Sequence, residues 1–89
     1  MKDPAYRALQ AALTTDRRPV ILACLAMLTF RDRTIVELYL GLGEGGRMHT
    51  QREIARVFRV TSARIGQMLR RSVAKVVAAS GVVVGGDLP

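Results

Sequence analysis

Residues 49–71, HTQREIARVFRVTSARIGQMLRR, contain two short amphipathic segments on either side of a joint at residues 59–61. Thr50 and Glu53 have the spacing of a capping box, in which each side chain accepts a hydrogen bond from the other residue's backbone N–H. Thr61 is suited to cap a second helix in the same way. This stretch therefore predicts two helices joined by a tight turn.

The apolar residues of this stretch have the spacing of a helix-turn-helix whose first position is Gln51. The inward-facing positions would be Ile54, Ala55, Phe58, Val60, Ile65 and Met68. The outward face of the second helix would carry Thr61, Ser62, Ala63, Gly66, Gln67 and Arg70. These side chains are small or can hydrogen-bond, which lets a helix lie deep in the major groove of DNA. Arg59 falls where the turn needs a left-handed residue, usually glycine, and another residue costs roughly 1 kcal/mol there.

Positive charge is concentrated in the same part of the chain. Residues 1–46 carry six basic and five acidic groups, whereas residues 47–75 carry eight basic groups and one acidic group, Glu53. Asp87 is the remaining acidic residue, and the net charge of the chain is +7. Basic charge confined to one segment is typical of a surface that binds a polyanion. Four aromatic residues in 89 argue against a stacking platform for single-stranded nucleic acid, so double-stranded DNA is the expected partner.

The rest of the sequence also predicts helices. One helix is expected over residues 4–14, because Asp3-Pro4 is a good helix start. A second is expected over residues 19–28, whose apolar run Val20–Leu28 would be buried, either in this core or against another chain. The fold class is therefore expected to be all-α, a small bundle of about five helices.

Thr29 begins a further expected helix, which would place Ile35, Leu38 and Leu42 on one face, with Val36 and Tyr39 beside it. Four glycines within residues 41–46 predict a loop after that helix. The loop has no Lys-Ser/Thr pair and follows a helix rather than a strand, so a simple connector is predicted and not a P-loop. Gly81 is expected to stop the last helix. We expect a single domain over residues 1–89, with the tail 80–89 left unassigned.

Enzymatic chemistry has little support in this sequence. It has no nucleophile–base pair, no paired carboxylates and no cluster with metal-ligand spacing, so we expect no catalytic residue, no metal site and no cofactor. Cys24 lies in an apolar run and is interpreted as a core residue, and His49 as a solvated loop residue. No apolar run is long enough to span a membrane and the N-terminus lacks a signal-peptide pattern, so a cytoplasmic or nucleoid-associated protein is expected.

Residues 28–76, LTFRDRTIVELYLGLGEGGRMHTQREIARVFRVTSARIGQMLRRSVAKV, resemble region 4 of the bacterial sigma-70 family. That region typically reads L-T-x-R-E, an apolar helix, F-G-L-G-x-G, and a helix-turn-helix ending in T-R-E-R-I-R-Q. The resemblance implies that residues 29–79 form the family unit and that helix 62–79 is the recognition helix. In that family the helix enters the major groove of the promoter −35 element, while the preceding helix and turn hold phosphates.

The resemblance also implies roles for individual residues. Thr50 would bind a phosphate at a helix N-terminus, Arg31 would touch the backbone, and Arg64 and Gln67 match the Arg and Gln of R-E-R-I-R-Q. Gln67 is the best candidate for a base contact, since glutamine suits the N6/N7 edge of adenine. The full set of predicted DNA-binding residues is Arg31, Arg47, Thr50, Gln51, Arg52, Thr61, Ser62, Ala63, Arg64, Gln67, Arg70 and Arg71.

Five positions depart from the family pattern. The leading Arg-Glu of the recognition helix is Ser62-Ala63 here, its later Arg is Gly66, and Glu37 and Tyr39 replace basic residues. The frame is kept while the reading residues change. We therefore expect a sequence other than the standard −35 element, read by Ser62, Ala63 and Gln67.

These observations predict a stand-alone transcriptional regulator of plasmid or phage type, a repressor in preference to an activator. Because one short module binds weakly, a homodimer on an inverted repeat is expected, joined by the helices within residues 1–28. The candidate dimer residues are Val20, Ile21, Leu25 and Leu28. The alternative for this run is that it completes a monomeric core. The alternative function is an adaptor that binds the flap of the RNA polymerase β subunit, as sigma region 4 does, and modulates sigma or promoter use.

Overall fold

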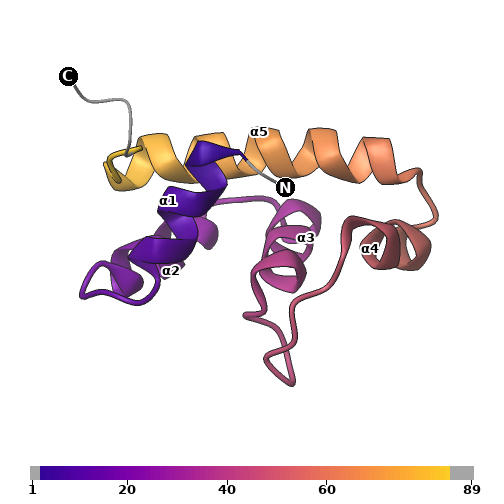
Figure 1. Cartoon of the computed structure of the whole chain (residues 1–89), viewed down its shortest axis with the longest axis horizontal. Helices are drawn as coiled ribbons and strands as arrows, with labels where there is room; N and C mark the ends of the chain where they lie inside the picture. Colours follow the sequence, from indigo (N-terminus) through magenta and orange to yellow (C-terminus); the bar gives the residue numbers. More distant parts are fainter. Residues whose placement is uncertain (1–2, 85–89) are drawn as a thin grey trace.

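The computed structural model describes residues 3–84, which form five helices and no strand. They are α1 (Pro4–Ala12), α2 (Arg18–Leu25), α3 (Phe30–Leu40), α4 (Gln51–Phe58) and α5 (Ser62–Ser80). α5 has 19 residues, which corresponds to a length of about 28 Å. It extends along one side of the molecule, and the other four helices pack against it (Figure 1). The predicted all-α bundle of about five helices is confirmed.

The core lies between α5 and the four shorter helices. α5 contributes one continuous apolar face, and each of the other helices buries at least one large side chain against it or its neighbours. The fully buried side chains are Leu9, Ile21, Leu25, Ile35, Val36, Ile54, Ile65, Leu69, Val73 and Val76. The four shorter helices all pack against α5. This packing on one face of α5 fixes the position of the opposite, exposed face of the same helix.

The apolar run Val20–Leu28 is only partly buried. Ile21 and Leu25, which were predicted as dimer contacts, lie in the core of the chain itself and are not available to a second chain. The alternative interpretation, that the run completes the core, holds for these two residues. Val20 is exposed and Leu28 is half-buried, so one side of α2 faces outward. Cys24 is buried as expected.

α1 ends two residues earlier than predicted, at Ala12 rather than residue 14. The hydroxyl groups of Thr14 and Thr15 donate hydrogen bonds of 2.7 Å to the carbonyl oxygens of Ala11 and Ala12. Threonine side chains that bond to nearby backbone groups compete with the helical hydrogen bonds and favour a turn. The chain therefore leaves α1 there.

α2 spans Arg18–Leu25 rather than residues 19–28. Beyond its end, the N–H groups of Met27 and Leu28 donate to carbonyls only three residues back, those of Cys24 and Leu25. Such i→i−3 bonds form a tighter turn than an α-helix. At the other end of the fold, the Arg17 guanidinium donates to the carbonyl of Ser80 and so ties the entrance of α2 to the end of α5.

The buried face of α3 differs from the predicted one. Ile35, Val36 and Leu40 are buried, whereas Leu38, Tyr39 and Leu42 are only half-buried. The helix stops because Gly41 has a left-handed φ of 76°, so Leu42 lies beyond the helix and its N–H donates to the carbonyl of Glu37 at 2.9 Å. Glycine adopts this backbone conformation without the penalty of a Cβ.

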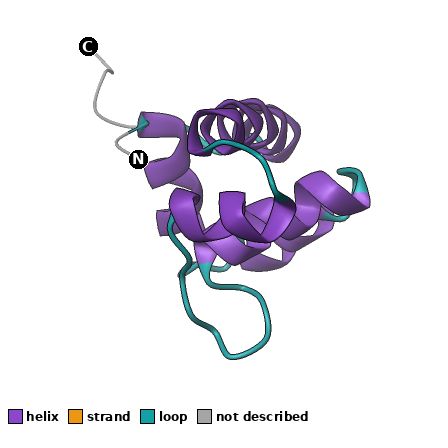
Figure 2. Ribbon diagram, turned by 90° about the vertical axis from the view of Figure 1, so that its right-hand side faces the viewer, coloured by secondary structure: helices purple, strands orange, loops and turns teal. Residues whose placement is uncertain are grey.

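The loop at residues 41–50 extends away from α5 in both views (Figures 1 and 2). This agrees with the prediction of a connector between two helices. His49 differs from its prediction as a solvated residue. It is half-buried, and its backbone N–H donates to the carbonyl of Leu38 at 3.0 Å, which anchors the end of the loop to α3.

The caps around α4 and α5 are confirmed. The Thr50 N–H donates to the Glu53 carboxylate at 2.9 Å, and the Glu53 N–H donates to the Thr50 hydroxyl at 3.1 Å, which completes the capping box. The Thr61 hydroxyl accepts the N–H of Arg64 at 3.1 Å. Between them Arg59 adopts the left-handed conformation expected of it, with φ 59° and ψ 43°. The angle between α4 and α5 therefore depends on three local features that the sequence predicts.

Thr50→Ala should lower the free energy of unfolding by about 0.5–2 kcal/mol, because α4 loses the oxygen that satisfies one of its first N–H groups. For a domain of this size, each 1 kcal/mol corresponds to a fall in melting temperature of roughly 4–8 °C. Thermal unfolding followed by circular dichroism measures the effect. Thr34→Ala is the matched control, because that hydroxyl donates within α3 to the carbonyl of Phe30 and caps no helix. An equal loss in both variants would contradict the assigned role of Thr50.

Candidate nucleic-acid interface

The first half of α5 presents an exposed polar face at the edge of the molecule. Seven of the predicted residues are exposed there, from the cap of the helix through its first two and a half turns. They are Thr61, Ser62, Ala63, Arg64, Gln67, Arg70 and Arg71. The structure therefore brings the predicted reading residues together on the surface of one helix, with the core side chains on its opposite side.

The helix-turn-helix pattern assigned most inward positions correctly. Ile54, Ala55, Ile65 and Met68 are buried. Phe58 is only half-buried. Val60 is 40% exposed, which contradicts its predicted inward position. Val60 follows the left-handed Arg59, and at this point the chain turns outward before α5 begins.

Gly66 was assigned to the outward face of α5, and this is wrong. It is buried, and the atoms closest to the position of a Cβ on Gly66 are the Gln51 Oε1, at 2.9 Å, and the Arg70 Nη1, at 3.5 Å. A side chain from α4 therefore covers this point of α5.

The N-terminus of α4 is directed at the same region. The capping box engages the N–H groups of Thr50 and Glu53. The two N–H groups between them, of Gln51 and Arg52, occupy the first helical positions and have no acceptor within their own helix. Together with the positive end of the helix dipole, such groups bind phosphate oxygens. The geometry therefore suits the predicted phosphate contact at Thr50–Arg52.

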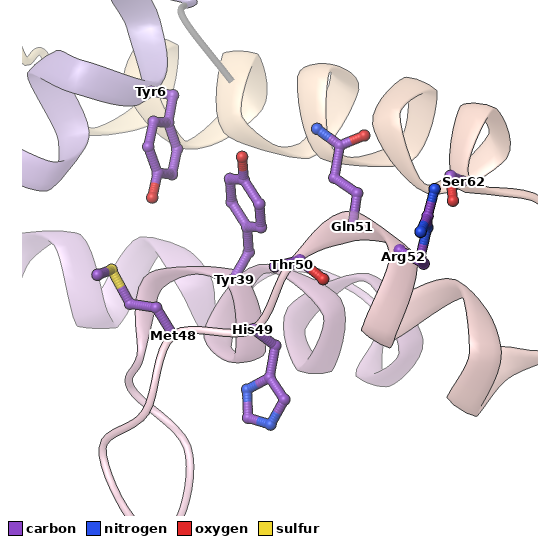
Figure 3. Close-up of a pocket in the computed structure, with 8 residues that line it drawn as sticks. All are labelled: Tyr6, Tyr39, Met48, His49, Thr50, Gln51, Arg52 and Ser62. Carbon is purple, nitrogen blue, oxygen red and sulfur yellow. The ribbon is translucent and has the colours of Figure 1, made fainter.

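An open cavity of about 570 Å³ lies beside this helix end (Figure 3). Its lining comes from four helices and the α3–α4 loop: Tyr6, Tyr39, Met48, His49, Thr50, Gln51, Arg52 and Ser62. Tyr6 of α1 and Tyr39 of α3 pack together with ring centroids 5.0 Å apart. Burial, and secondly the neighbouring Tyr39, raises the pKa of the Tyr6 hydroxyl above its usual value.

The single acidic residue of this region does not oppose an anion strongly. The Thr50 N–H, followed by Arg47, lowers the pKa of the Glu53 carboxyl below its usual value. Arg47 lies 3.2 Å from the Glu53 carboxylate, so the positive charge of Arg47 and the negative charge of Glu53 offset each other. The exposed basic residues that remain on α4, the turn and α5 are Arg52, Arg56, Arg59, Arg64, Arg70, Arg71 and Lys75.

Arg31 is the one predicted DNA-binding residue that lies on α3. It lies in the first turn of α3, where it pairs with Asp32 at 3.3 Å, and it does not line the cavity. Four residues line the cavity but were not among the predicted site residues: Tyr6, Tyr39, Met48 and His49. No local signal identified Tyr6, since it joins the site through a contact between helices, that of its ring with Tyr39 of α3.

A family model described as Sigma-70, region 4 matches residues 24–76. These residues run from the last two positions of α2 to the last turns of α5 and include the complete helix-turn-helix. No curated protein and no solved structure matches the chain. Among the described residues, no helix has the length and apolar character needed to cross a membrane.

Proposed function

This chain belongs to the sigma-70 region 4 family, whose helix-turn-helix binds DNA. We propose that it is a transcriptional regulator that binds double-stranded DNA in a sequence-specific way. The observation that carries the proposal is the exposed polar face of α5 between Thr61 and Arg71, next to the N-terminus of α4. In the proposed complex the recognition helix, residues 62–79, lies in the major groove. No catalysis forms part of this role, and the bacterial nucleoid is its proposed place of action.

The dimensions and chemistry of this face suit the major groove. A helix with its side chains is about 10–12 Å wide and the groove is about 12 Å wide. Ser62 and Ala63 at the front of α5 are short, so the helix can approach the bases closely. The backbone amides of Gln51 and Arg52 would hold a phosphate on one side, while Arg70 and Arg71 reach further phosphates.

Gln67→Ala should relax sequence preference at one base pair and weaken binding to the preferred site by about 1–3 kcal/mol. Gln67 is exposed on the reading face, and its amide can pair with the N6/N7 edge of adenine. Titration of the preferred duplex and of single-base variants, at fixed salt, measures both effects. If the variant keeps full selectivity, α5 does not dock as proposed.

We also propose that the regulator is a homodimer. Exposed apolar side chains occur on α2, on its connection to α3 and at the first residue of α3: Val20, Leu22, Met27 and Phe30. Met27 and Leu28 also line a small cavity of about 130 Å³ with Lys75, Val76 and Ala79 of the second half of α5. A second copy bound here, at the end of α5 opposite to Ser62, leaves both recognition helices free (Figure 1).

Met27→Ser combined with Phe30→Ser should convert the dimer to a monomer and weaken binding to an inverted repeat more than to a half-site. The two side chains are 77% and 86% exposed, so the fold should survive their replacement. Sedimentation measures the oligomeric state, and circular dichroism shows whether the fold survives. Val57→Ser, which also changes an exposed apolar residue, is the matched control and should remain dimeric. An unmodified chain that stays monomeric at high concentration would contradict the dimer.

Repression is proposed rather than activation, because a bound helix-turn-helix can exclude polymerase without a further contact. The second candidate function is an adaptor on the flap of the RNA polymerase β subunit. The same exposed apolar residues favour it, as does the replacement of family reading residues by Ser62, Ala63 and Gly66. An adaptor should bind an isolated flap fragment and lose that binding in the Met27→Ser, Phe30→Ser variant.

Selection of bound duplexes from a random pool at moderate salt separates these functions. Enrichment of an inverted repeat is the expected result and gives the spacing of the half-sites. A single asymmetric site would support a monomer that works beside polymerase. No enrichment would contradict the proposed regulator and favour the flap adaptor.

A further inference from the structure

Gly66 is an unusual residue for the centre of a recognition helix. Glycine is among the least favourable residues in a helix interior. Gly66 does not have a positive φ, so no left-handed backbone conformation requires a glycine here. Backbone conformation therefore does not explain this glycine. The space beside it does.

The side-chain amide of Gln51 fills the space at Gly66. Its Oε1 lies 2.9 Å, and its Cδ 3.8 Å, from the position that a Cβ on Gly66 would take. Real Cβ atoms essentially never come as close as 2.9 Å to another heavy atom, so any other residue at position 66 would require the flexible end of the Gln51 side chain to shift from this place. In Figure 3 the Gln51 side chain points from the start of α4 toward α5.

The amide of Gln51 thereby becomes part of the surface of α5. Ser62, Gly66 and Arg70 lie four residues apart and share one side of the helix. Arg70 Nη1 is 3.5 Å from the same Cβ position, so the amide and the Arg70 guanidinium both border Gly66. This stripe adjoins the exposed Ala63 and Gln67.

We propose that Gln51, although it belongs to α4, is a second specificity-determining side chain and contacts an adenine of the DNA. Gly66 is the positioning residue, because it leaves room for the Gln51 side chain on the reading face. The inference rests on the proposed function. A glutamine amide offers one donor and one acceptor side by side, the pattern that pairs with adenine N6 and N7. Because the amide is neutral, it releases no counterion, and its loss leaves the salt dependence of binding unchanged.

The test compares Gly66→Ala, Gln51→Ala and the double variant with the unmodified chain in duplex selection and titration. Each single variant should lose preference at the same base pair and bind the preferred duplex about tenfold more weakly. The double variant should be no weaker than Gln51→Ala alone, because Gly66 acts through Gln51. The salt slope should stay constant in all variants, and Gly66→Ala should melt at the same or a higher temperature, since alanine favours the helix.

Gly43→Ala is the matched control. Its added Cβ would make an ordinary contact of 3.7 Å with the side chain of Leu38, and its selectivity should equal that of the unmodified chain. If Gly66→Ala does not fold, Gln51→Ala carries the test, because Gln51 lies at the first position of α4, outside the hydrophobic core, and is only half-buried.

Three results would overturn the inference while the proposed function stands. They are unchanged selectivity in Gln51→Ala, effects of the two single variants at different base pairs, and a double variant whose losses multiply. A purely structural role for Gln51 would lower the melting temperature and weaken all duplexes alike, which also contradicts it. Absence of any preferred site for the unmodified chain would overturn the proposed function together with the inference.

Discussion

Leu69→Ala should destabilise the fold by about 2–5 kcal/mol, a large part of the roughly 5–15 kcal/mol that holds a domain of this kind together. Leu69 is fully buried near the middle of α5, the helix that the other four contact. The truncation removes apolar contacts and leaves a cavity that the surrounding helices fill only in part. The reading face is carried by the same helix, so DNA binding should decline with the folded fraction.

Urea unfolding followed by circular dichroism measures this loss of stability. Val57→Ala is the matched control, because Val57 is a large apolar residue that is exposed on α4, and its replacement should change stability by no more than about 0.5 kcal/mol. An unchanged unfolding midpoint for Leu69→Ala would mean that α5 is not the centre of the core.

Arg70→Ala combined with Arg71→Ala should weaken binding to every duplex by about tenfold or more for each lost contact, independently of sequence. Both side chains are exposed on α5 beyond the reading residues, where they would reach phosphates. Each lost contact should also reduce the salt slope of the binding constant by about one unit, since one fewer counterion is released. Titrations of specific and random duplexes at several salt concentrations measure both effects.

Replacement of the same two arginines by lysine is the control for charge. The lysine variant should keep the salt slope, because the number of positive charges is unchanged, and should lose only the geometry of the guanidinium contact. A double alanine variant that discriminates between duplexes differently, at an unchanged salt slope, would contradict the assignment of these arginines to phosphates.

The sequence predicts the helix-turn-helix well because its signals are local. The bonds between Thr50 and Glu53 and between Thr61 and Arg64 join residues only three apart. Such pairs are determined by neighbouring residues, so the sequence shows where they can form. The left-handed Arg59 also follows from its place between the two caps.

Predictions that depended on contacts between helices were less accurate. Gly66 was expected to face outward, but Gln51 of the neighbouring helix covers it. Ile21 and Leu25 were assigned to a dimer contact, but both are buried in the core of the chain itself. An apolar run shows that burial is needed and does not show which surface supplies it.

The proposed DNA-binding face is tested most directly by the NMR amide spectrum of the isotope-labelled protein, recorded during titration with its preferred duplex. If DNA binds the proposed face, the largest shifts should fall on Thr50–Arg52 and on the first half of α5, with small shifts on α2. Largest shifts on α2 and the start of α3, with the first half of α5 unaffected, would contradict it, since DNA would then bind the surface assigned to the second copy.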